Sequence, residues 1–162
     1  GRIDRIDRSI DGTRAHVTDY KTGSLPASMA KKTLTPLMSG EKIQLTVYRG
    51  ALSVLDEFKD VESIEAEYLH LQPKDGQTVS CSFTDAELNA AAEALPGILE
   101  IVGDGIENGS FSIRTSGAIR PDGHCDYCGY LPICGKDRVQ REQRKTKDPA
   151  IQRFMKMMEI AQ

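Results

Sequence analysis

Alternating apolar and polar positions near the N-terminus predict a β-hairpin. Two strand-like segments, residues 1–9 and 14–22, flank the dipeptide Asp11-Gly12. An Asp-Gly pair between two such segments is a strong local signal for a hairpin with a two-residue type I′ turn. If these two residues form the turn, paired residue numbers sum to 23, and Asp4 lies opposite Asp19.

Lys21 follows Asp19 by two positions, so strand alternation places it on the same face as both acids. Opposed side chains in an antiparallel pair have Cβ atoms about 4.5–5.5 Å apart, where two carboxylates repel each other unless a cation lies between them. Carboxylates are ligands that Mg²⁺ and Mn²⁺ prefer, and a bound metal acidifies its water and neutralises charge on a phosphoryl oxygen. An adjacent ammonium can hold the attacking water. The pattern therefore suits phosphodiester hydrolysis, although solvated strand residues would give the same pattern.

Further along the chain, the periodicity changes between helix and strand. A helix is predicted over about 41–58, with an apolar stripe of Ile43, Val47, Ala51, Val54 and Phe58 facing a sheet. Strands are predicted over 63–72, with Ile64, Ala66 and Tyr68 on one face, and over 77–83. Within the first helix, Gln44 and Tyr48 are spaced i, i+4 and share one face, where they could simply form a polar shoulder.

The C-terminal half is predicted to be mainly helical. Thr84 and Glu87 form a capping box for an Ala-rich helix that runs towards residue 108, with a kink or break at Pro96. An amphipathic helix is predicted over 148–162, its methionines covering core or a neighbouring domain. Together these elements predict an α/β (or α+β) fold with a small mixed sheet flanked by helices.

Three cysteines, Cys125, Cys128 and Cys134, form a C-x2-C-x5-C cluster in a turn-rich segment. Such close spacing is a strong signal for a metal but does not identify it. Zinc would need a fourth ligand, for which His124 and Cys81 are candidates, although Cys81 is better explained as a small buried residue. Disulfides are disfavoured because nothing in the sequence suggests secretion.

Composition sets bounds on these interpretations. The chain has 162 residues, 39% hydrophobic and 28% charged, which fits one globular domain. No apolar run reaches the roughly 18 residues that a membrane span requires. The net charge of −3 argues against a broadly basic nucleic-acid-binding protein. However, residues 136–147 hold six Lys or Arg, which could contact phosphates, bind a partner subunit or form a solvated helix face.

The motifs in combination also resemble a known family. Gly1-Arg2-Ile3-Asp4-Arg5-Ile6-Asp7, Asp19-Tyr20-Lys21-Thr22-Gly23 and Gln44-Leu45-Thr46-Val47-Tyr48 resemble, in order, the motifs of RecB-like nucleases in the PD-(D/E)xK superfamily. The closest resemblance is to the C-terminal nuclease domain of AddB-type helicase–nuclease subunits. It implies an αβββαβ-type core, with Mg²⁺ or Mn²⁺ held by Asp4, Asp19 and the main-chain carbonyl of Tyr20. It also implies that Lys21 is the catalytic lysine and that Gln44 and Tyr48 border the active site.

The same resemblance implies further cofactors and partners. Cys125, Cys128 and Cys134 resemble an iron–sulfur staple whose 4Fe–4S cluster takes its remaining cysteine from upstream of the core. Because Gly1 lies inside the first motif, we expect an N-terminally truncated chain that lacks this cysteine, the first helix and that helix's metal ligand. The cluster would then be incomplete, replaced by zinc, or left as free thiols. We expect a nuclease core over residues 1–120, and the cysteine cluster with a helical tail of the same domain over 121–162.

The expected function is that of a metal-dependent DNA exonuclease domain in a helicase–nuclease for recombinational double-strand-break repair. Its partners would be single-stranded DNA ends and helicase domains or a partner helicase–nuclease subunit, in the cytoplasm at the nucleoid and not at a membrane. Two alternatives stay open. One is a catalytically weak or inactive module that binds DNA or docks a subunit, and the other is a zinc-binding interaction domain.

Overall fold

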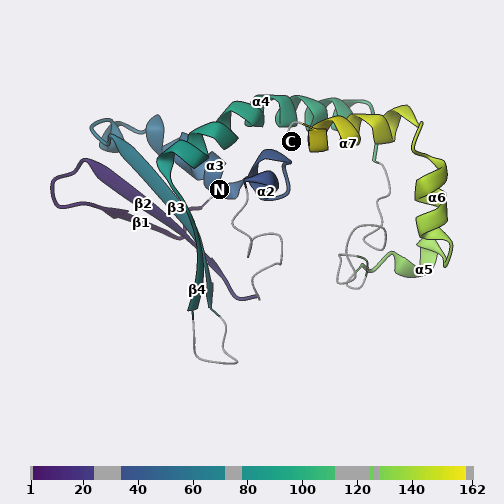
Figure 1. Ribbon diagram of the computed structural model, residues 1–162, viewed down its shortest axis with the longest axis horizontal. Coiled ribbons are helices and arrows are strands. Elements are labelled where there is room, and N and C mark those ends of the chain that lie inside the picture. The colour runs from purple at the N-terminus through teal and green to yellow at the C-terminus, as the bar shows by residue number, and fades with distance from the viewer. Residues whose placement is uncertain (1, 24–33, 72–77, 112–124, 126–127, 160–162) are drawn as a thin grey trace. The chain divides into compact units, whose positions relative to one another are not determined.

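A four-stranded mixed sheet forms the centre of the fold (Figure 1). The computed structural model describes residues 2–23, 34–71, 78–111, 125 and 128–159. The strands lie in the order β1 (Arg5–Arg8), β2 (Arg14–Lys21), β3 (Ser63–Leu71) and β4 (Thr78–Phe83). The two central strands are parallel, and each outer strand is antiparallel to its neighbour. The predicted small mixed sheet with flanking helices is therefore confirmed.

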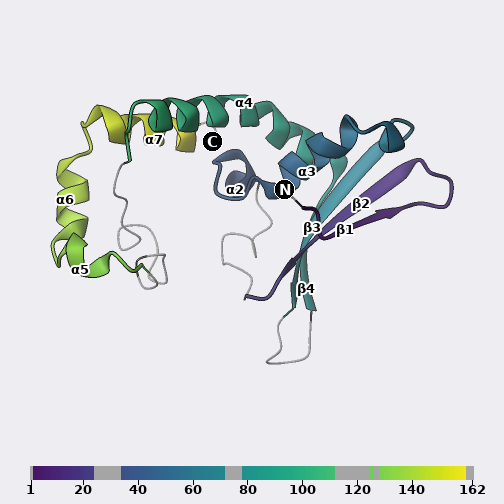
Figure 2. The ribbon, with the colours of Figure 1, turned by 180° about the vertical axis from the view of Figure 1, so that it is seen from behind.

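The helices are α2 (Thr35–Met38), α3 (Gln44–Ser53), the short 3₁₀ helix η1 (Asp56–Phe58), α4 (Asp85–Glu107), α5 (Leu131–Cys134), α6 (Arg138–Arg144) and α7 (Pro149–Glu159). α3 packs against the two central strands, β2 and β3, as both views of the ribbon show (Figures 1 and 2). The chain divides into two compact units, residues 1–99 with 157–162, and residues 100–156. None of the helices in the described part of the chain is long and apolar enough to cross a membrane.

The register of the β1–β2 hairpin is the predicted one, but its turn is different. Ile6 pairs with Val17, which satisfies the expected sum of 23. The main-chain N–H of Ser9 donates to Arg14, and that of Gly12 donates to Ser9, both at 2.9 Å. The connection is therefore residues 10–13, with Gly12 in the left-handed region at φ +77°. The observed loop is longer than the predicted two-residue turn by one residue on each side. The strand register is therefore the same as predicted.

The Asp11 side chain closes this loop. Its Oδ1 accepts hydrogen bonds from the Thr13 N–H at 3.1 Å, from the Thr13 hydroxyl at 2.9 Å and from the Ser9 hydroxyl at 2.5 Å. These bonds, that from Ser9 first, lower the pKa of Asp11 to about 2 because they favour the charged carboxylate. A short Asx-type network thus replaces the expected type I′ turn.

The sheet and helix α3 share a core that only partly matches the predicted pattern. Ile64, Ala66 and Tyr68 are buried on one face of β3, as expected from their alternation. The predicted stripe on α3 is wrong, because Val47 and Val54 are 42% and 81% exposed.

Leu45 and Leu52 bury the opposite side of that helix, about half a turn away from the predicted stripe. Two apolar faces competed in this short helix, and leucines bury more apolar surface than valine and alanine. The observed orientation brings Gln44 and Tyr48 next to the buried face.

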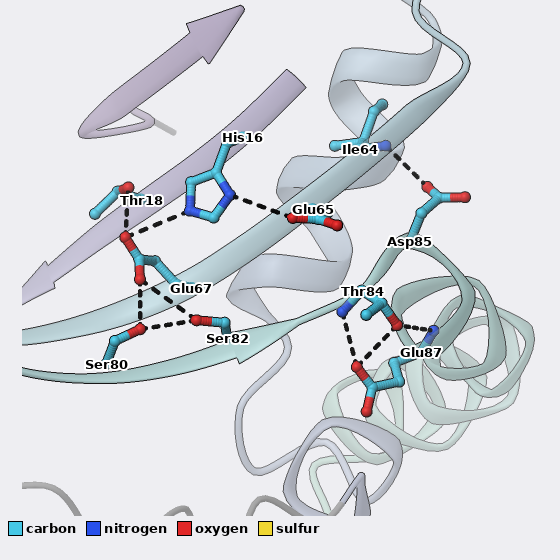
Figure 3. A network of polar contacts seen from close by, with 10 residues as sticks. All are labelled: His16, Thr18, Ile64, Glu65, Glu67, Ser80, Ser82, Thr84, Asp85 and Glu87. Carbon is cyan, nitrogen blue, oxygen red and sulfur yellow. Dashed lines mark hydrogen bonds and ion pairs between the residues drawn. The ribbon is translucent and has the colours of Figure 1, made fainter. Parts of the chain in front are cut away.

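Helix α4 begins with the predicted capping box. The Glu87 N–H donates to the Thr84 hydroxyl at 3.3 Å, and the Thr84 N–H donates to the Glu87 carboxylate at 2.8 Å (Figure 3). The next residue, Asp85, accepts from the Ile64 N–H and pairs with Arg49, both at 3.2 Å, which ties α4 to β3 and α3. α4 continues through Pro96, so the predicted break does not occur. α7 confirms the predicted C-terminal helix, with Ile151 and Met157 buried.

We expect the pH dependence of stability to report the Asp11 network. A carboxylate whose pKa is depressed stabilises the fold fully above its unfolded value near 3.8 and loses this contribution as pH falls towards 2. Urea midpoints measured between pH 5 and 2 should therefore fall more steeply for the wild type than for Asp11→Ala. Parallel curves for the two proteins would contradict the stabilising role of this carboxylate.

Candidate active site

The core face of β2 ends in an acid and a base that contact each other. Asp19 is only 3% exposed, and its Oδ2 lies 2.5 Å from the Nζ of Lys21. Lys21 Nζ also donates to Oε1 of Gln44, the first residue of α3, at 2.9 Å. A buried charge is costly unless it is paired, so this contact accounts for the burial of Asp19. Three of the residues predicted for the site, Asp19, Lys21 and Gln44, therefore meet at one point.

Asp4 reaches the same end of β2 from the segment just before β1. Its Oδ2 accepts a hydrogen bond from the main-chain N–H of Tyr20 at 3.0 Å. Tyr20 lies between Asp19 and Lys21, so the Asp4 carboxylate contacts the backbone that carries both. The predicted pair of Asp4 with Asp19 is not part of the hairpin register, which begins at Arg5 and Thr18, but the Asp4 carboxylate reaches the same strand end. Asp4 is exposed there, whereas Asp19 is buried.

Tyr48 contacts the main chain of the segment that carries Asp4. Its hydroxyl donates to the carbonyl oxygen of Arg2 at 3.2 Å. This bond holds the segment that carries Asp4 close to α3. Gln44 contacts the lysine, as the resemblance implies, whereas Tyr48 contacts the chain two residues before the acid.

Two buried residues of β3 complete the surroundings of the site, and sequence reasoning missed both roles. Tyr68 pairs with Asp19 in the parallel register, and Lys21 Nζ lies 5.3 Å from the centre of its ring. Burial, with a further contribution from the charge of Asp19, raises the pKa of the Tyr68 phenol. His70 pairs with Lys21, and its Nδ1 lies 2.8 Å from the Gly23 carbonyl oxygen. Only the pairing of β2 with β3, which joins segments about 49 residues apart, brings them here.

The donor atoms at this site fit a hard divalent cation. Asp19 Oδ2 is buried and forms no hydrogen bond within the described residues, apart from its ion pair with Lys21. Asp4, Asp19 and the Tyr20 carbonyl would supply oxygen ligands of the kind that Mg²⁺ and Mn²⁺ take. No three His, Cys, Asp or Glu side chains converge as ligands in the described part of the chain. A cation here would therefore depend on main-chain oxygen, water and substrate, which is usual for Mg²⁺.

The opposite face of the sheet carries a separate polar network (Figure 3). His16 Nε2 lies 3.4 Å from a Glu67 carboxylate oxygen, and Nδ1 lies 3.9 Å from Glu65. Burial works to raise the pKa of Glu67, but hydrogen bonds from Ser80, Thr18 and His16 outweigh it and lower the pKa. Asp7 lies opposite His16 in the hairpin, and its carboxylate pairs with Arg5 at 2.7 Å. The network stabilises the sheet and lies away from Asp19.

The cysteine-rich segment belongs to the second compact unit. The Cys128 N–H donates to the Cys125 carbonyl at 3.3 Å, and Cys134 ends helix α5. Cys128 and Cys134 form no disulfide within the described residues. His124, a proposed fourth ligand, lies outside the described residues. Cys81 is buried on β4 opposite Tyr68, as expected for a small core residue. The metal or cluster at the cysteines therefore stays a prediction.

Comparison with known families adds to this geometry. Residues 1–135 match the sequence profile of the PD-(D/E)XK nuclease superfamily, which is well over half of the chain. The chain belongs to the PD-(D/E)XK nuclease superfamily. Neither a curated protein nor a solved structure matches it significantly.

Membership of the PD-(D/E)XK superfamily indicates a nuclease, which hydrolyses phosphodiester bonds. Enzymes of this superfamily usually require divalent cations, in agreement with the oxygen donors at the end of β2. The mixed sheet with α3 packed on one face is consistent with the fold of the superfamily.

We expect Asp19→Asn to weaken Mn²⁺ binding by roughly tenfold or more, because the amide removes the negative charge at the buried donor. Isothermal titration calorimetry would measure the affinity. The matched control is Asp7→Asn, which removes one carboxylate from the opposite face of the same hairpin and should leave Mn²⁺ affinity unchanged. Equal affinities for wild type and Asp19→Asn would exclude Asp19 as a ligand.

Proposed function

We propose that this chain is a metal-dependent DNA exonuclease domain. In this proposal Asp4, Asp19 and the Tyr20 carbonyl hold Mg²⁺ or Mn²⁺, and Lys21 is the catalytic lysine. The observation that carries it is the joint contact of Lys21 Nζ with Asp19 and Gln44, in a chain of a nuclease superfamily. A carboxylate can hold the metal and an ammonium can stabilise charge on the phosphoryl group, and these residues provide both at one point.

When bound, the metal would supply an acidified water and neutralise charge on the phosphoryl group. The ammonium of Lys21 donates hydrogen bonds to the attacking oxygen or to a non-bridging phosphate oxygen as charge develops. The water loses one proton as its oxygen forms a bond to phosphorus, the bond to the leaving oxygen breaks, and the leaving oxygen takes up a proton. The products are a phosphate monoester and an alcohol.

The neighbouring residues keep these groups in position. Gln44 has an acceptor oxygen 2.9 Å from the ammonium, so it orients the lysine without adding charge. Asp4 accepts from the Tyr20 N–H, and Tyr48 holds the carbonyl of Arg2. Through these two bonds the segment before β1 and helix α3 set the end of β2, and correct geometry is a main source of catalysis.

The motif resemblance supports a finer proposal, that the domain belongs to an AddB-type, RecB-like helicase–nuclease in recombinational repair. Its substrates would be single-stranded DNA ends, and its partners helicase domains or a partner helicase–nuclease subunit. The C-x2-C-x5-C spacing of Cys125, Cys128 and Cys134 supports a 4Fe–4S cluster in such a protein, with zinc as the alternative.

Residues 136–147 support the choice of DNA as substrate. They include six Lys or Arg, whereas the whole chain has a net charge of −3. Arg138, Arg141 and Arg144 lie on α6, and Lys145 directly follows this helix. Clustered cations on and beside α6 suit contacts with a phosphate backbone.

A second candidate is a DNA-binding or subunit-docking module that turns over slowly or not at all. The observation that favours it is that no group of three or more His, Cys, Asp or Glu side chains converges to hold a metal within the described residues. The two candidates differ in one result, namely cleavage in the presence of Mg²⁺ or Mn²⁺.

We expect Lys21→Met to lower cleavage of end-labelled single-stranded DNA by roughly 100-fold or more in Mn²⁺, because the ammonium that stabilises developing charge is lost. The control is Lys59→Met, which removes an exposed lysine beyond α3. Single-turnover rates would measure the chemical step. Full activity in Lys21→Met would contradict the proposed mechanism, and metal-independent DNA binding without cleavage by the wild type would favour the second candidate.

The basic segment should contribute to DNA affinity through phosphate contacts. We expect the triple variant Arg141→Gln, Arg144→Gln, Lys145→Gln to bind single-stranded DNA more weakly and with a shallower salt dependence. The slope of log K against log salt should fall by about 2, at roughly 0.7 per lost contact. Fluorescence anisotropy at several salt concentrations would measure it, with Lys59→Gln as control. An unchanged slope would assign the segment to another partner or to solvent.

A further inference from the structure

The ring of Tyr68 lies where it can hold the lysine of the site. Tyr68 is 2% exposed, on the face of β3 that carries Ile64 and Ala66, and it pairs directly with Asp19. Lys21 Nζ lies 5.3 Å from the ring centre, within the range of a cation–π interaction. The ammonium thus has three neighbours, namely the Asp19 carboxylate, the Gln44 amide oxygen and this aromatic face.

These neighbours are not equivalent once a cation binds. A divalent ion held by Asp19 would compete with the ammonium for the same carboxylate and would repel it electrostatically. Gln44 and the Tyr68 ring are uncharged, so a bound metal ion would not compete with the ammonium for them. They therefore stay available as contacts of Lys21 when the metal is bound.

The ring, and not the hydroxyl, is the part of Tyr68 that fits this role. The hydroxyl is buried and has no hydrogen bond of ordinary geometry within the described residues, although it lies near the backbone of Leu45. A buried hydroxyl without a partner costs stability, whereas the ring face lies towards the ammonium. Phenylalanine would keep the ring and remove only the unpartnered oxygen.

We propose that Tyr68 is a positioning residue, whose ring holds the Lys21 ammonium in place when a divalent cation occupies Asp19. The inference rests on the proposed function, because it assigns Tyr68 a role through Lys21 and the metal. Tyr68 touches neither the substrate nor the cation in this proposal.

The test compares two substitutions at one position. Tyr68→Phe should keep most of the wild-type kcat, since the ring remains. Tyr68→Leu should lower kcat by roughly tenfold, with the KM for single-stranded DNA and the calorimetric Mn²⁺ affinity unchanged. A loss of kcat alone separates a misplaced lysine from a damaged binding site.

Phe83→Leu is the matched control for packing. Phe83 is an equally buried aromatic residue of the same core, on β4 opposite Ala66, and no ring contact with Lys21 is seen for it. Both leucine variants should lose similar stability in urea, but only Tyr68→Leu should lose kcat beyond that of Phe83→Leu. Equal kcat values in the two leucine variants, or a tenfold loss in Tyr68→Phe, would overturn the proposal.

A spectroscopic measurement on the wild type avoids any dependence on folding of the leucine variants. Reductive ¹³C-methylation gives each lysine an NMR signal, and that of Lys21 is identified by its absence in Lys21→Arg. A ring below the amine shifts this signal upfield, and we expect the shift to persist when Mg²⁺ saturates the protein. Loss of the shift at saturation would overturn the role of Tyr68.

Failure of the proposed function and failure of the role of Tyr68 would give different experimental results. If the wild type neither binds Mn²⁺ nor cleaves DNA, the nuclease assignment fails. If the wild type cleaves and Lys21→Met does not, while Tyr68→Leu equals Phe83→Leu, only the role of Tyr68 fails.

Discussion

The burial of one carboxylate next to one ammonium is the constraint on which the site depends. Asp19 is almost fully buried at the end of β2, and a charge in that position must be paired. Lys21 supplies the pair from the same strand, and Gln44 holds Lys21 from α3. The packing of α3 on β2 and β3 is therefore also what aligns the acid with the base.

One face of the sheet leads to the candidate site, and the other face carries a network that stabilises the sheet. On the core face, Ala15 and Val17 lead along β2 to Asp19, so the strand that builds the core ends in the site. On the other face, Glu67 accepts hydrogen bonds from Thr18 on β2 and Ser80 on β4, which connects three strands (Figure 3). A rigid strand end is a suitable support for a catalytic group, because small displacements cost much of the rate.

Family membership indicates the activity and the fold, whereas the geometry of the site indicates the residues. The superfamily match indicates a nuclease and is consistent with the fold, but it does not assign a role to any residue. The contacts of Asp4, Asp19, Lys21 and Gln44 identify residues that could carry out the chemistry. The cysteine segment and the basic segment lie in the other compact unit.

Local sequence patterns determined those features of the fold that depend on residues close together in the chain. The register of the hairpin, the alternation on β3 and the capping box at Thr84 were all predictable, because each depends on residues a few positions apart. The common face of Asp19 and Lys21 followed from strand periodicity alone.

Tertiary packing decided which side of α3 is buried and which residues surround the site. It selected Leu45 and Leu52 as the buried side of α3 over a competing stripe of similar periodicity. It also placed Tyr68 beside Asp19 and under Lys21, through a parallel pairing of distant segments that no local pattern encodes.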